Sequence, residues 1–317
     1  MLTAVLSLTG ALVYGAADFI GGLAAKRMSA VLVTAIAAVA GLTVMLVALP
    51  VLGGEWSTAD LAWGAVSGLV GAAAIALLYA SLAIGPMSIL SPLTALMSAV
   101  TPILWGTLVA SERFGPLGAW GLGLALVAVV LVGFVPERGA VRPSTRGILL
   151  AIGAGLAIGA YYIVISHTSD ESGVVPLVAN RVVAASVLFL AVGVLAVAGR
   201  ARAATVPVAV GGGGDAPTDA AGPAADAAGS PAGPGRRSPL ATAVTLALAC
   251  GVLDAVANVL LLLGIRSGDL AVAAVLGAMY PAGTVLLAAI VLRERIAPVQ
   301  WVGLALALAA AGMLALA

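Results

Sequence analysis

Long runs without charged residues are the feature that most limits what this chain can fold into. The sequence is 62% hydrophobic and 9% charged over 317 residues, whereas a soluble globular domain carries about 25% charged residues. So few charges cannot cover a surface that faces water. The apolar runs are long enough to cross a bilayer as helices, which takes about 20 residues for each crossing. We therefore expect a membrane protein.

Dividing the chain at charged residues, proline and glycine gives about ten candidate spans. The runs are continuous rather than alternating, which excludes the pattern of a membrane β-barrel. No basic residue precedes the first run, so we expect a retained span and not a cleaved signal peptide. The predicted fold class is an all-α polytopic membrane protein. The candidate spans are roughly 2–25, 30–52, 60–84, 88–110, 115–135, 147–167, 173–198, 240–265, 270–291 and 297–316.

The connection at 200–238 differs from the other, mostly short, loops. It consists largely of Gly, Pro, Ala and Asp without periodicity. A segment of this composition buries too little apolar surface to offset the entropy that ordering would cost. We expect a disordered surface loop that serves as a spacer.

The second half of the chain repeats a pattern from the first half. Glu112 and Glu294 each follow a candidate span, and their separation is 294 − 112 = 182, which also separates Gly121 from Gly303. With an odd number of spans in each copy, the second copy enters the membrane from the opposite side. We therefore predict two inverted five-helix repeats with about ten transmembrane helices in all. The predicted repeats are 1–135 and 136–317.

This repeated pattern resembles the EamA domain of the drug/metabolite transporter superfamily, in its ten-helix type. In the second copy Pro281 precedes an apolar run, the Arg-Glu-Arg sequence around Glu294 and Gly303. The first copy matches less closely, because Pro102 is displaced by about one helical turn. The resemblance covers the chain apart from the 200–238 loop. It implies ten helices, two inverted repeats, and export or exchange of small metabolites across the cytoplasmic membrane of a bacterium.

Two aspartates lie inside predicted spans, where an ionisable group costs roughly 2.5–3.5 kcal/mol. Asp254 is near the middle of the eighth span, with Asn258 one turn later on the same face. Asp18 is in the first span, about two turns before Lys26. Both are candidates for coupling to protons or for binding an amine on the substrate. The structural alternative is an aspartate that caps a broken helix or binds neighbouring backbone.

Tyrosines and prolines inside the spans complete the candidate site. Each tyrosine is either a cavity wall offering a hydroxyl or a packing residue bonded to a neighbouring helix. Pro102 and Pro281 are predicted helix kinks, and each frees a backbone carbonyl that a cavity can use. The predicted substrate-binding residues are Tyr14, Asp18, Tyr79, Trp105, Tyr161, Tyr162, Asp254, Asn258 and Tyr280.

Other functional classes lack a signature in this sequence. The single histidine, His167, and the single cysteine, Cys250, make no metal cluster. No zinc-protease, nucleophile-elbow or Walker motif is present, and no basic cluster suits nucleic acid. We expect no catalytic residue, metal, cofactor or nucleic-acid partner. Arg181 resembles the basic residue that often opens the second EamA helix and is interpreted as an interfacial anchor. The two repeated glutamates are expected to cap neighbouring helix starts.

The predicted function is secondary active transport of small organic solutes, such as metabolites, amino-acid-like compounds or drugs, by rocking of the two repeats. The protein would export or exchange its solute, coupled to protons or another ion, as a monomer or homodimer among membrane lipids. Alternatives are a flippase for lipid-linked or hydrophobic compounds and a non-transporting membrane scaffold. Basic residues lie mostly on the side away from the termini, which places the termini outside, whereas the resemblance implies cytoplasmic termini.

Overall fold

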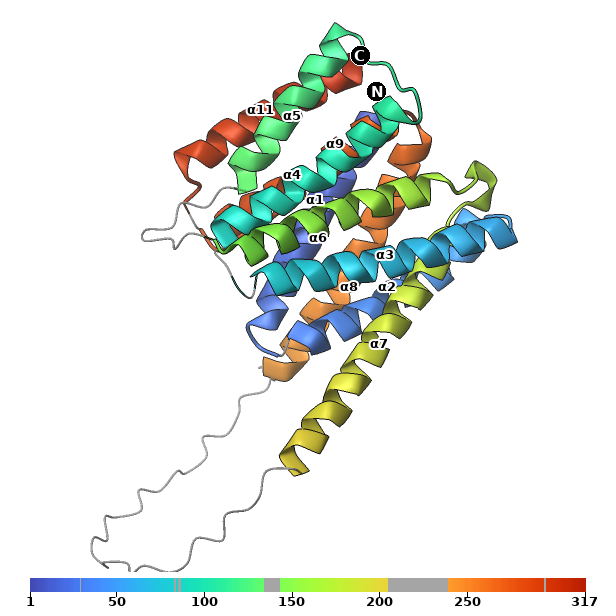
Figure 1. Cartoon of the computed structure of the whole chain (residues 1–317), viewed down its shortest axis with the longest axis vertical. Coiled ribbons are helices and arrows are strands. Elements are labelled where there is room, and N and C mark those ends of the chain that lie inside the picture. Colours follow the sequence, from blue (N-terminus) through green and yellow to red (C-terminus); the bar gives the residue numbers. More distant parts are fainter. Residues whose placement is uncertain (29, 83, 85–86, 134–142, 205–238, 294) are drawn as a thin grey trace, which may run out of the picture.

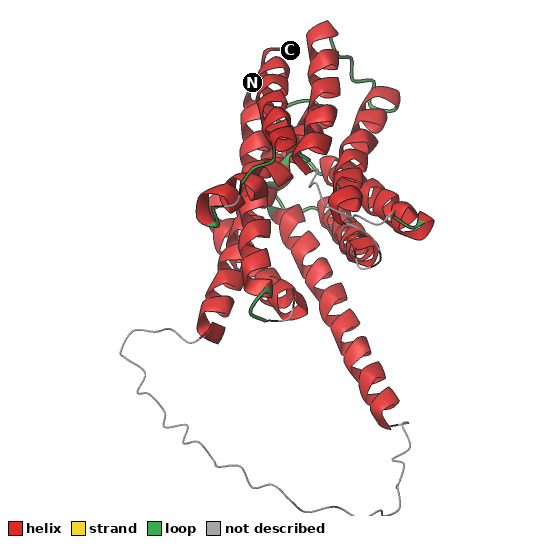
Figure 2. Ribbon diagram, turned by 90° about the vertical axis from the view of Figure 1, so that its left-hand side faces the viewer, coloured by secondary structure: helices red, strands yellow, loops and turns green. Residues whose placement is uncertain are grey.

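The described part of the chain is helical (Figure 1). The computed structural model describes residues 1–28, 30–82, 84, 87–133, 143–204, 239–293 and 295–317, and no strand occurs among them (Figure 2). A short 3-10 turn, η1, lies at Asp170–Ser172. The α-helices are α1 (Leu2–Ala25), α2 (Ala30–Leu52), α3 (Thr58–Leu82), α4 (Met87–Leu108), α5 (Pro116–Gly133), α6 (Thr145–Ser166), α7 (Val175–Ala204), α8 (Pro239–Arg266), α9 (Leu270–Gly277), α10 (Tyr280–Val291) and α11 (Pro298–Leu316).

Within the described residues, nine helical segments are long and apolar enough to cross a membrane, with α9 and α10 counted together. In α7 the described apolar stretch is shorter, Val175–Ala191. Lipid offers no hydrogen bonds, so a spanning segment has to satisfy its own backbone, and a helix does so. The prediction of an all-α polytopic membrane protein is confirmed, and the count of ten spans stays a prediction.

Two predicted elements differ from the structure. Helix α7 continues to Ala204, so the predicted loop begins as helix at residue 200; residues 205–238 lie outside the described residues. The ninth span is interrupted, because α9 ends at Gly277 and α10 begins at Tyr280. Pro281 therefore lies in the first turn of α10, where its missing N–H costs no hydrogen bond, and it does not kink a helix interior. Pro102 does lie inside α4.

The helices pack as two bundles, each drawn from both halves of the chain (Figure 1). In the first, called the α1 bundle, α8 packs along α1 and α2, and α9 and α10 pack on α1. In the second, called the α3 bundle, α6 packs along α3 and α4, and α7 packs along α3. The bundles meet where α4 contacts α9 and α2 contacts α7, while α5 and α11 pack on each other.

The two bundles have equivalent packing when each span of the first half is matched with the span five places away in the second half. The packing of α1 on α8 then corresponds to that of α6 on α3, and the packing of α2 on α8 to that of α7 on α3. Backbone conformation follows the same relation. Among the described residues, positive φ outside glycine occurs at Ser111 (59°) and Arg293 (55°), which each precede a repeated glutamate. These correspondences support the inverted repeat, whose boundaries stay a prediction.

Both termini lie at the same end of the molecule (Figure 1), called here the terminal end. Because successive spans alternate in direction, this end also holds the loops 53–57, 109–115, 167–174 and 267–269. The other end is called the opposite end.

Helices α1 and α10 cross in close contact at Gly15. A Cβ atom there would lie 2.6 Å from the Thr284 nitrogen, and the Thr284 hydroxyl donates a hydrogen bond to the Gly15 carbonyl at 3.1 Å. Gly22, on the same helix, has nothing within 4 Å of its Cβ position. We expect Gly15→Ala to destabilise the protein by about 1–3 kcal/mol through overpacking. Gly22→Ala is expected to be neutral or slightly stabilising, because alanine favours helix. Equal apparent melting temperatures for the two purified variants would contradict this crossing.

Candidate functional site

Arg181 and Asp254 form an ion pair between the two bundles. Arg181 lies about two turns inside α7 of the α3 bundle, and Asp254 lies near the middle of α8 of the α1 bundle. The side chains are 17% and 27% exposed, so protein encloses most of the pair. Arg181, interpreted from the sequence as an interfacial anchor, is instead paired with a charge inside the protein. The sequence signal that could have indicated this pairing was a basic residue, Arg181, within an apolar run.

Local packing of α7 on α3 places Arg181 there. The Asn180 side chain is buried and donates a hydrogen bond to the Ser67 hydroxyl at 2.8 Å, and this hydroxyl donates to the Gly64 carbonyl at 2.7 Å. Polar groups of this kind hold membrane helices together, because lipid offers no alternative partner. The anchored Asn180 fixes the rotation of α7, and the next residue is thereby directed toward α8.

A second polar contact joins the bundles one turn further along α8. The Tyr161 hydroxyl donates a hydrogen bond to Asn258 Oδ1 at 2.8 Å, and Asn258 Nδ2 donates to the Asp254 carbonyl at 2.7 Å. Asn258 is 5% exposed, and both ends of its amide have partners, as buried polar groups require. Tyr161 is thus held beside the ion pair by a hydrogen bond to a neighbouring helix. The role of Tyr161, Asp254 and Asn258 in binding a substrate stays a prediction.

Asp18 reaches the same region from α1. It is exposed and makes no hydrogen bond or ion pair with a described residue. Its charge acts on Asp254 and on Tyr280, the first residue of α10. Tyr14, one turn earlier on α1, is close enough to Asp254 and Arg181 to interact with their charges. The predicted residues Tyr14, Tyr161 and Asn258 therefore lie near the ion pair, and Tyr280 lies near Asp18.

The side chains around the ion pair differ in how exposed they are. On the inner strip of α1, Ala11 is buried, Tyr14 is half-buried and Asp18 is exposed; helical spacing places them on one face. On α8, Asn258 is buried and Cys250, two turns toward the opposite end, is half-buried. Further toward the opposite end, Ala247 of α8 is buried again, in a cluster with Ala24 of α1. Exposure is therefore confined to the side chains beside the ion pair, and Asp18 is the most exposed of the residues named here.

An apolar cluster closes the terminal side of the ion pair. It packs Tyr162 and Ile165 of α6 and Val178 of α7 against Leu261 of α8 and Leu270 of α9. All five are less than a tenth exposed. Tyr162, a predicted substrate-binding residue, therefore packs in this cluster, with its ring 5.5 Å from that of Tyr161.

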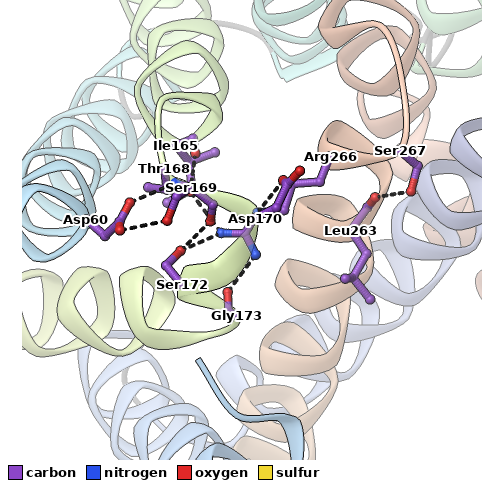
Figure 3. A network of polar contacts seen from close by, with 10 residues as sticks. All are labelled: Asp60, Ile165, Thr168, Ser169, Asp170, Ser172, Gly173, Leu263, Arg266 and Ser267. Carbon is purple, nitrogen blue, oxygen red and sulfur yellow. Dashed lines mark hydrogen bonds and ion pairs between the residues drawn. The ribbon is translucent and has the colours of Figure 1, made fainter. Parts of the chain in front are cut away.

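A polar layer lies beyond the cluster, at the terminal end (Figure 3). Arg266, the last residue of α8, binds the loop between α6 and α7. One guanidinium nitrogen donates to the Gly173 carbonyl at 2.7 Å. Another donates to the hydroxyls of Thr168 at 3.0 Å and Ser172 at 2.8 Å. The Arg266 Nε lies 3.7 Å from an oxygen of Asp170. These contacts link the end of the α1 bundle to a loop of the α3 bundle.

The same loop is held on α3 by Asp60 (Figure 3). The Asp60 carboxylate accepts hydrogen bonds from the Ser169 backbone N–H at 2.7 Å and from the Ser169 hydroxyl at 2.8 Å. The Asp60 backbone N–H is in turn bound by the Ser57 hydroxyl at 3.3 Å, which caps the start of α3. The loop that Arg266 binds is therefore a fixed part of the α3 bundle.

Glu112 caps the start of α9. Its carboxylate accepts hydrogen bonds from the backbone N–H groups of Leu270 at 2.9 Å and Ala271 at 3.3 Å. A helix N-terminus favours a negative charge in this position. Partial burial raises the pKa of the Glu112 carboxyl above its usual value, although these two N–H groups lower it. The predicted capping role is confirmed for Glu112, and Glu294 lies outside the described residues.

Trp105 is at the terminal end and not at mid-membrane. It lies in the last turn of α4, and its ring is 6.1 Å from that of His167, which lies 4.8 Å from Trp63. Trp105 and His167 line a cavity of about 300 Å³ beside Arg266. Trp105, a predicted substrate-binding residue, is therefore separated from the ion pair, because it lies near the end of α4 at Leu108. Tyr79 lies in α3, but its side chain is outside the described residues.

Residues 230–316 match the EamA-like transporter family. The match covers the end of the chain, including α8 to α11. The match agrees with the resemblance seen in the second half of the sequence. Together with the nine apolar helical segments among the described residues, it supports an integral membrane protein.

Comparison with curated proteins finds no match. A solved structure described as "Crystal structure of protein" is similar at 17% sequence identity. The similarity covers 99% of this chain and 96% of that one, with a TM-score of 0.63. The two proteins therefore share a fold, and the similarity includes both halves of this chain.

Proposed function

We propose that this protein is a secondary active transporter that moves small organic solutes across the membrane by alternating access. One observation carries this proposal. The Arg181–Asp254 ion pair joins two bundles at membrane depth, between the exposed Asp18 on one side and a buried apolar cluster on the other. Charged groups at this depth mark solute or ion pathways.

The moving bodies are the α1 bundle and the α3 bundle, each built from both repeats. The sequence suggested instead that the two repeats rock against each other. Packing supports the bundles, because α8 lies along α1 and α6 lies along α3, so that each bundle mixes helices from the two halves. Opening at one end and closing at the other then requires only the contacts between bundles to change.

Asp18 carries the coupling proton or cation. Two aspartates were candidates, but Asp254 is already engaged in an ion pair with Arg181 in this arrangement. Asp18 is exposed in the same region without a described partner.

The polar groups around the ion pair favour a polar solute over the lipid-like cargo of a flippase. A small-molecule substrate, protons and surrounding lipid are the partners that follow.

Transport by the purified protein in lipid vesicles tests this function. Solutes are first selected by their ability to raise the melting temperature of the purified protein, since a ligand that binds the folded state stabilises it. We expect at least one selected solute to enter protein-containing vesicles faster than empty ones, and to accumulate when a pH gradient is imposed. Solutes that stabilise the protein without ever crossing the vesicle membrane would indicate a binding protein or scaffold instead.

A further inference from the structure

Arg266 makes the most extensive polar contact between the bundles at the terminal end. Its guanidinium donates to three acceptors, all of them in residues 168–173 of the loop that connects α6 and α7. The side chain is 11% exposed. Charge-assisted hydrogen bonds in an enclosed site are stronger than neutral ones, so this contact holds the α8 end of the α1 bundle against the α3 bundle.

The hydrogen bonds of Arg266 are also of a kind that can break when the bundles separate. Two of its acceptors are hydroxyls and one is a backbone carbonyl, while the nearest carboxylate, on Asp170, is 3.7 Å from Nε and its side chain is 80% exposed. The buried Nε has no hydrogen-bond partner among the described residues. An unsatisfied buried donor costs free energy, and water would satisfy it once the bundles separate. Arg266 is therefore held by acceptors that water can replace.

We propose that Arg266 and the α6–α7 loop form the gate that closes the terminal side of the transport path. The proposal rests on the proposed function. In the state described here the gate is closed, because Arg266 is bound to the loop and the apolar cluster beneath it is buried. Asp60 keeps the loop on α3, so Arg266 has a fixed surface to bind.

Two positions report on the two sides of the ion pair. Cys250, the single cysteine, lies one turn from Asp254 toward the opposite end and is half-buried. Val178 lies one turn from Arg181 toward the terminal end and is 6% exposed within the apolar cluster. Val178→Cys in a Cys250→Ser background introduces a thiol of similar size beneath the gate. Its reaction rate with a small maleimide follows opening of the terminal side, and that of native Cys250 follows opening of the opposite side.

Arg266→Gln is the test variant, and Arg266→Lys keeps the charge while removing the planar fork of donors. Arg113→Gln is the matched control, because Arg113 lies at the same end, is exposed and has no described hydrogen bond or ion pair. Losing the hydrogen bonds of a charged donor is expected to speed modification of Val178→Cys by about tenfold or more. Modification of Cys250 is expected to slow in the same variant. Arg266→Lys should fall between Arg266→Gln and the unsubstituted protein.

The outcomes separate the gate from the transport function, because labelling requires no substrate. Opposite changes at the two thiols, absent in Arg113→Gln, support the gate. Unchanged rates at both thiols would overturn it. Faster labelling of both thiols would also overturn it. That result would show that the whole protein had loosened, whereas a gate switches the protein between two states that are each closed on one side. A functioning gate in a protein that moves no solute would leave the inference intact and refute the proposed function.

Discussion

Replacing Arg181 with methionine is expected to destabilise the protein by about 3–5 kcal/mol and to abolish solute transport. The substitution leaves the Asp254 carboxylate without its partner at membrane depth. Asp254→Leu is expected to cost a similar amount, because it leaves the guanidinium unpaired. Arg113→Met, at an exposed position without a described partner, is the control and should behave like the unsubstituted protein.

The double variant Arg181→Met/Asp254→Leu separates stability from function. Replacing both partners with apolar side chains removes the unpaired charge, so the double variant should be more stable than either single variant. Apparent melting temperatures of the four proteins give this comparison. Transport should still be absent, because the charges themselves are gone. A double variant as unstable as the sum of the single variants would contradict an ion pair between these residues.

Asp18→Asn is expected to uncouple transport from the pH gradient. The exposed Asp18 carboxylate has no described hydrogen bond or ion pair, so an amide of the same shape should fold normally. The amide cannot bind and release a proton. In vesicles, exchange of labelled for unlabelled solute should continue, while accumulation driven by a pH gradient should fall to the level of empty vesicles.

Asp269→Asn is the matched control for this experiment. Asp269 is exposed at the terminal end, at the start of α9, and its side chain makes no capping hydrogen bond. The control should accumulate solute as the unsubstituted protein does. If Asp18→Asn also accumulated solute with an unchanged dependence on pH, the coupling role would have to move to another residue or to another ion.

The positions of the helices were readable from the sequence, because bilayer thickness sets the length of an apolar run. The predicted span 30–52 has the same limits as α2 (Ala30–Leu52), and 2–25 those of α1. Capping by Glu112 was also predictable, because a carboxylate that directly follows a span lies at the membrane surface, where neighbouring helices begin. The residues Tyr14, Asp18 and Asp254 could be selected because polar side chains are rare at membrane depth.

The pairing of side chains from different helices was not readable in the same way. Arg181 lies close to the start of α7, and only the packing of α7 on α3, through Asn180 and Ser67, directs it toward α8. The break in the ninth span had a local signal, because Pro281 lacks the N–H that a continuous helix needs. The sequence did not distinguish a kink from a new helix start, and in the structure α10 begins at Tyr280, where α1 crosses it closely at Gly15.

Solute accumulation by the Arg181→Met/Asp254→Leu double variant tests the central claim most directly. The unsubstituted protein and the double variant are reconstituted at equal amounts into vesicles with the same imposed pH gradient, after their folding has been checked by melting temperature. If the mid-membrane ion pair lies on the transport path, the unsubstituted protein accumulates the solute and the folded double variant does not. Equal accumulation by the two proteins would show that the ion pair only holds helices together, and that the transport path lies elsewhere.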